Sequence, residues 1–153
     1  MFIIRPYLES DLDDIIALWE LCDLTRPWNN PEIDIFRKVA HKDGLFLVAV
    51  KDDQLIATLM GGYDGHRGWV NYLAVHPHAQ RNGVTTALIQ QLEKRLIALG
   101  CPKLQLLLPK ENIDVYSFYE QLGYEEMDMV CLGKRLIQNQ AWHFTALKRR
   151  SYL

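Results

Sequence analysis

The stretch from Trp69 to Leu99 constrains the fold of this chain more than any other. The apolar run Trp69 to Val75 has the length of a strand, and a short polar loop follows it. From Leu88 onward, leucines recur at helical spacing, and Gly100 ends that pattern. The almost continuously apolar run 103–108 predicts a further strand, buried on both faces. A strand, a helix and a strand in this order predict one parallel crossover in a sheet.

The rest of the pattern predicts an antiparallel sheet around that crossover. Polar turns, one of them at Asp64 and Gly65, join three apolar runs into a predicted antiparallel meander. We therefore expect one α/β domain, in the α+β sense, with a mixed, mostly antiparallel sheet flanked by helices. The expected elements are strands over 2–5, 45–50, 55–63, 69–75, 103–108 and 124–132, and helices ending near Cys22, starting after Pro31, and covering 85–99 and 114–122.

The loop between strand and helix has the character of an anion site. The first N–H groups and the positive dipole end of the following helix meet at residues 80–85, which favours a phosphate or pyrophosphate there. Gly83 lies where the backbone would approach the anion closely, and a side chain would obstruct that approach. The loop has neither the Gly-Lys-Ser/Thr ending of a P-loop nor the Gly-x-Gly-x-x-Gly of a dinucleotide turn. Taken by itself, it is also compatible with a plain helix start.

Length, charge and cysteine content narrow the class of protein. A chain of 153 residues fits one domain and is expected to bury about 68–70% of its unfolded surface, so it needs neither a disulfide nor a metal to fold. The net charge of −2 gives no basic face for nucleic acid. The three cysteines are scattered, so we expect buried, reduced thiols and no metal site. With no leader-like start and no long apolar run, we predict a cytoplasmic protein that does not bind a membrane.

The polar loop resembles the acyl-CoA loop of the GCN5-related N-acetyltransferases (GNAT), whose pattern is Gln/Arg-x-x-Gly-x-Gly/Ala. In this chain the loop reads Gln80-Arg81-Asn82-Gly83-Val84-Thr85. The first four positions fit the pattern, and Thr85 departs from it.

A second segment resembles the other signature of the family, Asn-x-x-Ala-x-x-Phe-Tyr-x-x-x-Gly-Phe. The matching residues are Asn112, Phe118, Tyr119, Gly123 and Tyr124, with Val115 in place of the alanine. Two signatures in the expected order, separated by the expected helix and strand, are far more specific than either alone.

The resemblance extends over most of the chain, from about residue 2 to residue 135. Residues 9–137 look more narrowly like the YpeA-type bacterial branch of the family, through short segments around Trp28, Gly65 and Lys134. We take 1–137 as an N-acetyltransferase domain and 138–153 as a C-terminal extension. The aromatic residues of that extension would dock a partner subunit or cover the acceptor site, unless the extension is a loosely packed end.

The resemblance implies transfer of an acetyl group from acetyl-CoA, used as a cosubstrate without a metal, to an amine that attacks directly. Backbone N–H groups of residues 80–85 would hold the pyrophosphate. The strand residues Leu73, Ala74 and Val75 would offer main-chain partners to the pantetheine arm and a donor to the thioester carbonyl. Arg81 would pair with phosphate or stay solvated. Thr85 would either weaken CoA binding or add a hydroxyl contact.

The second signature implies roles for two polar residues. Tyr119 is the candidate general acid, because a phenol with a pKa of about 10 keeps its proton at neutral pH. From its spacing alone, Tyr119 is equally a core aromatic beside Phe118. Asn112 is a candidate for a hydrogen bond to the pantetheine amide, with a turn-forming role as the alternative.

The general base is not identified by any motif. Presenting a lysine-like amine uncharged at pH 7.4 costs about 4 kcal/mol. The strand from Trp69 offers no carboxylate, only Asn71 and Tyr72. Asp64 and His66 in the preceding turn are candidates, although an Asp-Gly turn usually serves backbone shape. Candidates for acceptor recognition in the loop after the first helix are Asp23, Arg26 and Trp28.

These residues predict an acetyl-CoA-dependent N-acetyltransferase acting on a primary amine of a small molecule or a peptide. The expected partners are that amine and a second copy of the chain in a homodimer, with no nucleic acid and no membrane. The alternative is a non-catalytic acyl-CoA sensor or interaction module, favoured by Thr85 and by the missing strand carboxylate. A protein that binds a partner without any CoA is a third reading.

Overall fold

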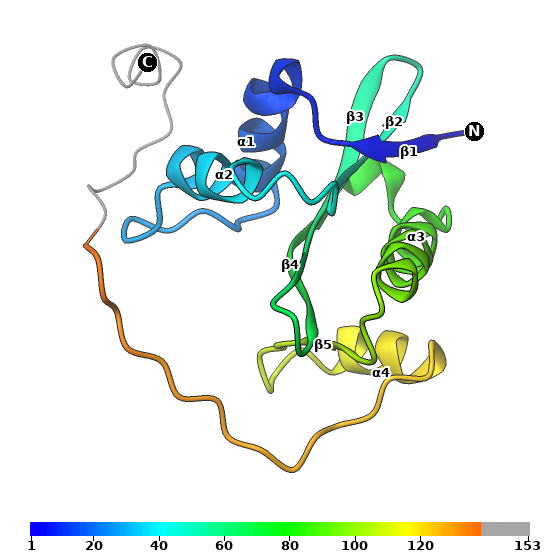
Figure 1. Ribbon diagram of the computed structural model, residues 1–153. Helices are drawn as coiled ribbons and strands as arrows, with labels where there is room; N and C mark the ends of the chain where they lie inside the picture. The colour runs from blue at the N-terminus through cyan, green and yellow to red at the C-terminus, as the bar shows by residue number, and fades with distance from the viewer. Residues whose placement is uncertain (139–153) are drawn as a thin grey trace.

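The computed structural model describes residues 1–138. Five strands form one sheet in the order in which they follow along the chain, β1-β2-β3-β4-β5 (Figure 1). Neighbouring strands from β1 to β4 are antiparallel, and β5 lies parallel to β4. The predicted fold class and its single parallel crossover are therefore confirmed. The elements are β1 (Ile3–Pro6), α1 (Leu12–Leu21), α2 (Pro31–Val39), β2 (Phe46–Lys51), β3 (Gln54–Tyr63), β4 (Gly68–Val75), α3 (Val84–Ala98), β5 (Leu104–Leu106) and α4 (Ile113–Gln121).

Helices cover both faces of the sheet, as Figure 1 shows, with α1 and α2 on one side and α3 on the other. On the first face the indole of Trp19 is fully buried in a cluster with Phe46 and Ala74. On the second face Leu88 and Leu92 of α3 are fully buried against the sheet. The sheet therefore has a separate apolar core on each side, and β4 contributes residues to both.

The close approach of α3 to the sheet depends on a glycine in β3. A Cβ atom placed on Gly61 would lie 2.4 Å from Leu92 Cδ1 and 2.9 Å from the carbonyl oxygen of Leu45. Any larger residue would push α3 away from the sheet. Because the loop at the start of α3 moves with that helix, Gly61 helps to fix the position of the loop.

Two predicted strands differ from the structure. The run predicted to be buried on both faces forms only the three-residue β5, whose side chains are half-buried, and Leu107 beyond it is 64% exposed. Within the described residues, 124–132 contain no strand, so the predicted last strand is wrong. This segment follows α4 as an irregular chain and is almost entirely exposed (Figure 1). The neighbouring strand along the sheet, β5, has only three residues and so offers little backbone to pair with.

The cysteines are unpaired, as expected, but they are not all buried. Cys101 is buried, Cys22 is half-buried and Cys131 is exposed. In the part of the chain that the structure describes, no helix is both long and apolar enough to cross a membrane. Residues 139–153, nearly all of the predicted C-terminal extension, lie outside the described residues.

Candidate functional site

One edge of β4 is open over most of its length. β5 pairs with β4 only from Gly68 to Val70, so among residues 1–138 no strand pairs with this edge from Asn71 to Val75. Leu73 and Val75 pack toward the α3 side, and Ala74 is buried on the α1 side. The three predicted strand residues therefore lie together in the part of β4 with this unpaired edge, where the Val75 carbonyl accepts the Cys22 thiol at 3.4 Å.

A bulge interrupts β4 at Tyr72. The register between β3 and β4 shifts opposite Thr58 and Met60, and Tyr72 has a positive φ of 48°. Such a conformation is rare for a bulky residue and is often found at functional sites. The bulge is held by the side chain of Thr58, whose hydroxyl donates to the Tyr72 carbonyl at 2.9 Å. That hydroxyl in turn accepts the indole N–H of Trp19 at 2.8 Å.

A short 3-10 helix, η2 (Pro77–Ala79), connects β4 to the predicted anion loop. Arg81 and Gly83 both have positive φ values, 66° and 85°, so the chain turns sharply before α3. The first helical bond of α3 runs from the N–H of Ala87 to the Gly83 carbonyl, and the N–H of Val84 donates to Asn82 Oδ1 at 3.2 Å. Within residues 1–138, the N–H groups of 80–83, 85 and 86 have no acceptor. Several main-chain donors thus remain for an anion.

The left-handed backbone, rather than crowding by the protein, explains the glycine at position 83. A Cβ atom built on Gly83 meets nothing within 4 Å. The space in front of the loop is therefore open, and the positive φ is the property that favours glycine. The place of Gly83 in the proposed anion site stays a prediction, while its conformational role is visible in the structure.

The remaining predicted binding residues belong to this loop, to the first turn of α3 and to the start of α4. Gln80 and Arg81 are exposed, and Thr85 is half-buried in the first turn of α3. Asn112 is exposed at the N-terminus of α4, where its side chain makes no capping bond. Its carbonyl accepts the N–H of Tyr116, so its main chain, and not its amide, starts the helix.

Tyr119 lies in the core on the α3 side and is 4% exposed. Its ring meets the rings of Phe118 and Tyr124 edge to face, with centroids 5.3 and 5.5 Å away. Burial raises the pKa of Tyr119 to about 12, which keeps the phenol protonated well beyond neutral pH. This position is compatible with both interpretations of Tyr119, as a general acid and as a core aromatic. A tyrosine packed in the core still has a hydroxyl proton.

Asp64, one of the two candidate bases in the turn before β4, stabilises that turn. Asp64 Oδ1 accepts the N–H groups of His66 and Arg67 at 2.8 and 2.7 Å, and Oδ2 accepts the indole N–H of Trp69. The hydrogen bonds from the Arg67 and His66 N–H groups lower the pKa of Asp64. A carboxylate used in this way is a poor proton acceptor, so the structural role is favoured for Asp64.

Sequence reasoning missed a carboxylate that reaches β4 from another element. The Tyr72 hydroxyl donates to Oδ2 of Asp34, on α2, at 2.6 Å. Burial and then this hydrogen bond raise the pKa of Tyr72. The two residues are 38 positions apart, and no local spacing connects them. The only available signal was the position of Asp34 on an amphipathic helix near the candidate acceptor loop.

The candidate acceptor loop between α1 and α2 is exposed. Trp28 is 58% exposed, so it is not a packing residue of the core. Arg26 donates to the carbonyls of Asp23 and Thr25, within its own loop. From the far end of the described chain, Arg135 donates to the Trp28 carbonyl and to Asn29 Oδ1. The loop is thus fixed by main-chain contacts while its indole stays accessible.

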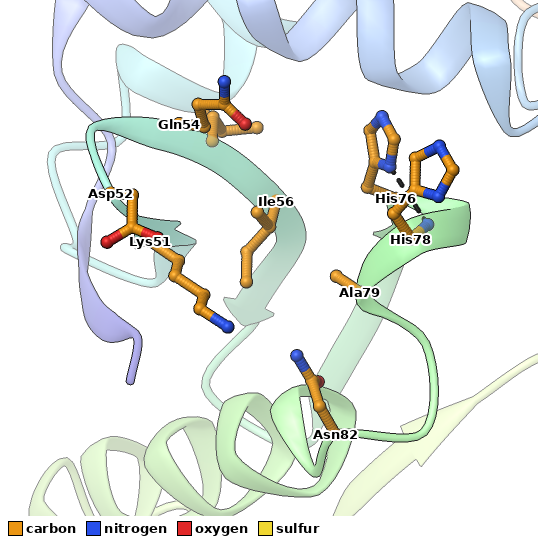
Figure 2. A pocket seen from close by; sticks show the side chains of 9 residues that line it. Lys51, Asp52, Gln54, Ile56, His76, His78, Ala79 and Asn82 are labelled. Carbon is orange, nitrogen blue, oxygen red and sulfur yellow. Dashed lines mark hydrogen bonds between the residues drawn. The ribbon is translucent and has the colours of Figure 1, made fainter.

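A pocket of about 210 Å³ lies beside the loop, between it and the β2–β3 turn (Figure 2). Figure 2 shows the Lys51 ammonium directed toward Asn82, and the rings of His76 and His78 side by side. These rings stack with centroids 5.2 Å apart, and the N–H of His78 donates to His76 Nδ1 at 3.1 Å. Leu73, Ala74 and Val75 do not line this pocket. It therefore adjoins the anion loop but not the open edge of β4.

Comparison with protein families identifies the family to which a chain with this fold and this loop belongs. The model of the acetyltransferase (GNAT) family matches residues 13–124, most of the chain. The chain belongs to the acetyltransferase (GNAT) family. This match covers the open edge of β4, the anion loop and α4 together, so the two sequence signatures lie within one family domain.

Solved structures agree with this assignment at the level of the fold. An aminoglycoside 6'-N-acetyltransferase from Acinetobacter haemolyticus is 23% identical, with a TM-score of 0.65, over 89% of this chain and 99% of that one. A glucosamine-6-phosphate N-acetyltransferase from Arabidopsis thaliana is 20% identical, with a TM-score of 0.67, over 90% and 99%. AAC(6')-Iy, solved with the bisubstrate analogue CoA-S-monomethyl-acetylneamine, is 17% identical, with a TM-score of 0.67, over 90% and 99%. At these identities the likeness shows that this GNAT protein shares their fold.

Proposed function

We propose that this GNAT protein transfers an acetyl group from acetyl-CoA to a primary amine of a small molecule or a peptide. The observation that carries the proposal is two sets of main-chain groups that follow one another along the chain. One edge of β4 is unpaired from Asn71 to Val75, and in the loop before α3 the N–H groups of residues 80–83 and 85 have no acceptor within residues 1–138. An extended amide chain followed by a pyrophosphate is complementary to these two sets of groups.

The residues at the loop fit the phosphate part of the proposed ligand. The N–H groups of residues 80–85, except that of Val84, are free to donate, and Gly83 leaves open space in front of them. The half-buried Thr85 keeps its main-chain donor, so its departure from the family pattern does not remove the anion contact. Arg81 is exposed beside the loop, and its guanidinium would add charge to phosphate binding.

The β4 residues fit the acyl end of the ligand. Leu73, Ala74 and Val75 offer main-chain groups on the open edge, and the bulge at Tyr72 redirects the N–H that follows it. A donor aimed at the thioester oxygen stabilises the charge that develops there, by roughly 3 kcal/mol when well placed. Asn112, exposed at the start of α4, would donate to the amide chain.

Bound acetyl-CoA would supply an activated acetyl group with a thiolate leaving group. Tyr119 is our candidate for the group that meets the departing sulfur. Its pKa, raised by burial to about 12, exceeds that of a thiol, about 8.5, so complete transfer of its own proton is uphill. Tyr119 therefore gives its proton to the sulfur only as the acceptor nitrogen replaces that proton in the same step.

Thermal unfolding with and without acetyl-CoA tests the proposal, with ADP as a control for nonspecific anion binding. Ligand at about 100 times its dissociation constant adds roughly 2.7 kcal/mol, a shift of several degrees. The second step is a panel of primary amines, followed by detection of released CoA thiol. A shift specific to acetyl-CoA together with thiol release that needs an amine is the expected result. No shift at millimolar acetyl-CoA would reject the proposal.

The same experiment separates the alternatives. A non-catalytic acyl-CoA sensor would show the thermal shift without amine-dependent thiol release. A partner-binding protein would show neither. The narrower likeness to the YpeA-type branch, a cytoplasmic location and a homodimer remain predictions that these measurements do not address.

A further inference from the structure

The hydrogen bond between Tyr72 and Asp34 places a carboxylate at the open edge of β4. Tyr72 is the bulged residue of that edge, and its hydroxyl lies 2.6 Å from Asp34 Oδ2. The side chain of Asp34 is 23% exposed, so water reaches it without opening the fold. Strand β4 carries no carboxylate of its own. The fold therefore supplies from α2 the group that the strand lacks.

Tyr72 and Tyr119 belong to opposite faces of the sheet. Tyr72 packs with the cluster of Trp19 and Ala74, on the α1 and α2 side. Tyr119 belongs to the cluster of Leu88, on the α3 side. The sheet lies between the two phenol rings. One face thus offers a group for a leaving thiolate, while the other offers a hydroxyl already bound to a carboxylate.

Two arginines lie near the pair. Arg37 Nη1, also on α2, lies 3.8 Å from Asp34 Oδ1. From the segment after α4, the positive charge of Arg135 acts to lower the pKa of Tyr72. Burial and the bond to Asp34 outweigh that effect and raise the pKa, so Tyr72 stays protonated at neutral pH. The proton of the pair therefore resides on the phenol, and Asp34 is the member able to accept another.

We propose that Tyr72 and Asp34 together remove the proton of the acceptor amine, an inference that rests on the proposed acetyl transfer. The Tyr72 hydroxyl passes its proton to Asp34 Oδ2 and takes one from the acceptor ammonium. The uncharged nitrogen then forms a bond to the acetyl carbonyl carbon, and the carbon–sulfur bond breaks. The second proton leaves the nitrogen and ends on the CoA sulfur through Tyr119. Asp34 finally releases the first proton to water.

This assignment narrows the acceptor to a cationic amine. A lysine-like amine, with a pKa near 10.4, is almost entirely charged at neutral pH, and uncharging it costs about 4 kcal/mol at pH 7.4. An amine that is already uncharged at that pH does not need the base. The carboxylate of Asp34 also attracts an ammonium to the α2 side of the edge. We therefore expect alkylamines to be the acceptors that depend on the pair.

Asp34→Asn and Tyr72→Phe test the inference, with Asp14→Asn and Tyr7→Phe as matched controls. Asp14 is an exposed carboxylate on α1. Tyr7 stacks on Phe46 on the same face of the sheet, with centroids 5.2 Å apart. For every variant, the acetyl-CoA thermal shift is measured first. Rates of CoA release are then measured from about pH 5.5 to about pH 9, a range that lies between the pKa values of a carboxylate and of an alkylamine. The acceptors are one alkylamine and one amine that is uncharged at neutral pH.

For the alkylamine, kcat/KM of the wild-type protein is expected to be flat around neutral pH, because the pair takes the proton of the ammonium, which is the abundant form of the amine. In Asp34→Asn only the uncharged fraction of the amine reacts, so kcat/KM is expected to rise about tenfold per pH unit. At pH 7 the variant is expected to lose about 100-fold or more with the alkylamine and far less with the uncharged amine. The Tyr72→Phe variant is expected to follow the same pattern, while both controls match the wild type.

A measurement that does not depend on catalysis tests whether the hydrogen bond between Tyr72 and Asp34 forms in solution. In an alkaline titration followed by tyrosinate absorbance, Asp34→Asn is expected to lower the pKa of one tyrosine relative to the wild type. Identical titrations would mean that the bond does not form in solution, which would overturn the inference. A pH profile of Asp34→Asn that matches the wild type would also overturn it, as would loss of the acetyl-CoA shift in that variant. No shift, or no amine-dependent turnover, in the wild type would instead reject the acetyl transfer on which the inference rests.

Discussion

The indole of Trp19 and the phenol ring of Tyr72 stack face to face, with ring centroids 3.8 Å apart and planes 6° from parallel. The same indole donates to Thr58, which holds the Tyr72 carbonyl. Trp19 therefore supports both the side chain and the main chain of the β4 bulge. A helix residue on one face of the sheet fixes the conformation of a residue on the open edge.

Replacing Trp19 by Leu is expected to lower the free energy of unfolding by about 3–5 kcal/mol, because a fully buried indole leaves a cavity and Thr58 loses its donor. Urea unfolding measures the change. Trp28→Leu is the control, since its indole is 58% exposed and its loss should cost within about 0.5 kcal/mol. Equal costs at the two positions would contradict the structural role of Trp19.

Gly83→Asp is expected to abolish the acetyl-CoA thermal shift while the protein still folds. The aspartate would bring negative charge into the open space where the anion is proposed to bind. Gly65→Asp is the matched control, because Gly65 also has a positive φ, 92°, and open space around its Cβ. Both variants should lose about 1–2 kcal/mol of stability from backbone strain. An unchanged acetyl-CoA affinity in Gly83→Asp would remove the basis for the loop assignment.

Tyr119→Phe is expected to reduce kcat by about 100-fold or more and to leave acetyl-CoA binding intact. The ring remains in the core, so its edge-to-face contacts with Phe118 and Tyr124 are preserved. Steady-state rates and the acetyl-CoA thermal shift are measured in parallel. If kcat is unchanged, Tyr119 is a core aromatic and has no part in the chemistry.

The stability of the protein is expected to fall as the pH rises from about 10 to about 12. Burial raises the pKa of Tyr119 to about 12 from the ordinary value of 10.0, so the folded state holds this proton more tightly than the unfolded state. The contribution is complete below pH 10 and is lost through the folded pKa, by about 2–3 kcal/mol. Urea unfolding across this range measures it. In Tyr119→Phe the alkaline decline should be shallower, although the raised pKa of Tyr124 will remain.

At acid pH the corresponding group is Asp11. Its carboxylate accepts two bonds from Arg5, at 2.7 and 2.9 Å, and one from the N–H of Leu8. Burial acts to raise the pKa of Asp11, but these hydrogen bonds and the charge of Arg5 outweigh burial and lower it. The stabilisation is therefore present above the unfolded pKa of about 3.9 and is lost as the pH falls through the folded pKa.

Asp11→Asn tests this contribution, since it is expected to destabilise the protein at pH 7 by about 1–3 kcal/mol. The gap between the variant and the wild type should narrow as the pH falls below about 4. Urea unfolding at a series of pH values compares the two. A gap that stays constant with pH would mean that the charge of Asp11 does not stabilise the fold.

The strand order, the parallel crossover and the loop before α3 could be predicted from the sequence because each is encoded by neighbouring residues. The apolar runs around Asp64 fix the antiparallel pairs, and the run ending at Val75 leads into a helix that buries Leu88 and Leu92. The predicted strand over 124–132 failed for the opposite reason. Apolar character favours a strand, but a strand forms only against a partner, and β5 offers three residues.

The Tyr72–Asp34 hydrogen bond and the bulge could not be predicted, because both arise from contacts between distant segments. Tyr72 and Asp34 are 38 positions apart, and Trp19 and Thr58 are 39 apart. The positive φ of Tyr72 also runs against the preference of its residue type, so no propensity indicates it. Gly83, in contrast, has the positive φ that its residue type permits at low cost, and the sequence marked its position.

The early end of β5 has a consequence for how this protein can change during evolution. Past Val70 the recognition groups of β4 are amides of the main chain, which every residue type except proline provides in full. Side chains at Leu73 and Val75 face the core rather than a ligand, so their replacement by other apolar residues alters packing before it alters binding. A binding edge of this kind is retained as long as the backbone conformation is retained, even when the side chains change. The proposed acceptor side depends instead on the side chains of Asp34 and Tyr72, so we expect single substitutions there to change which amine is accepted.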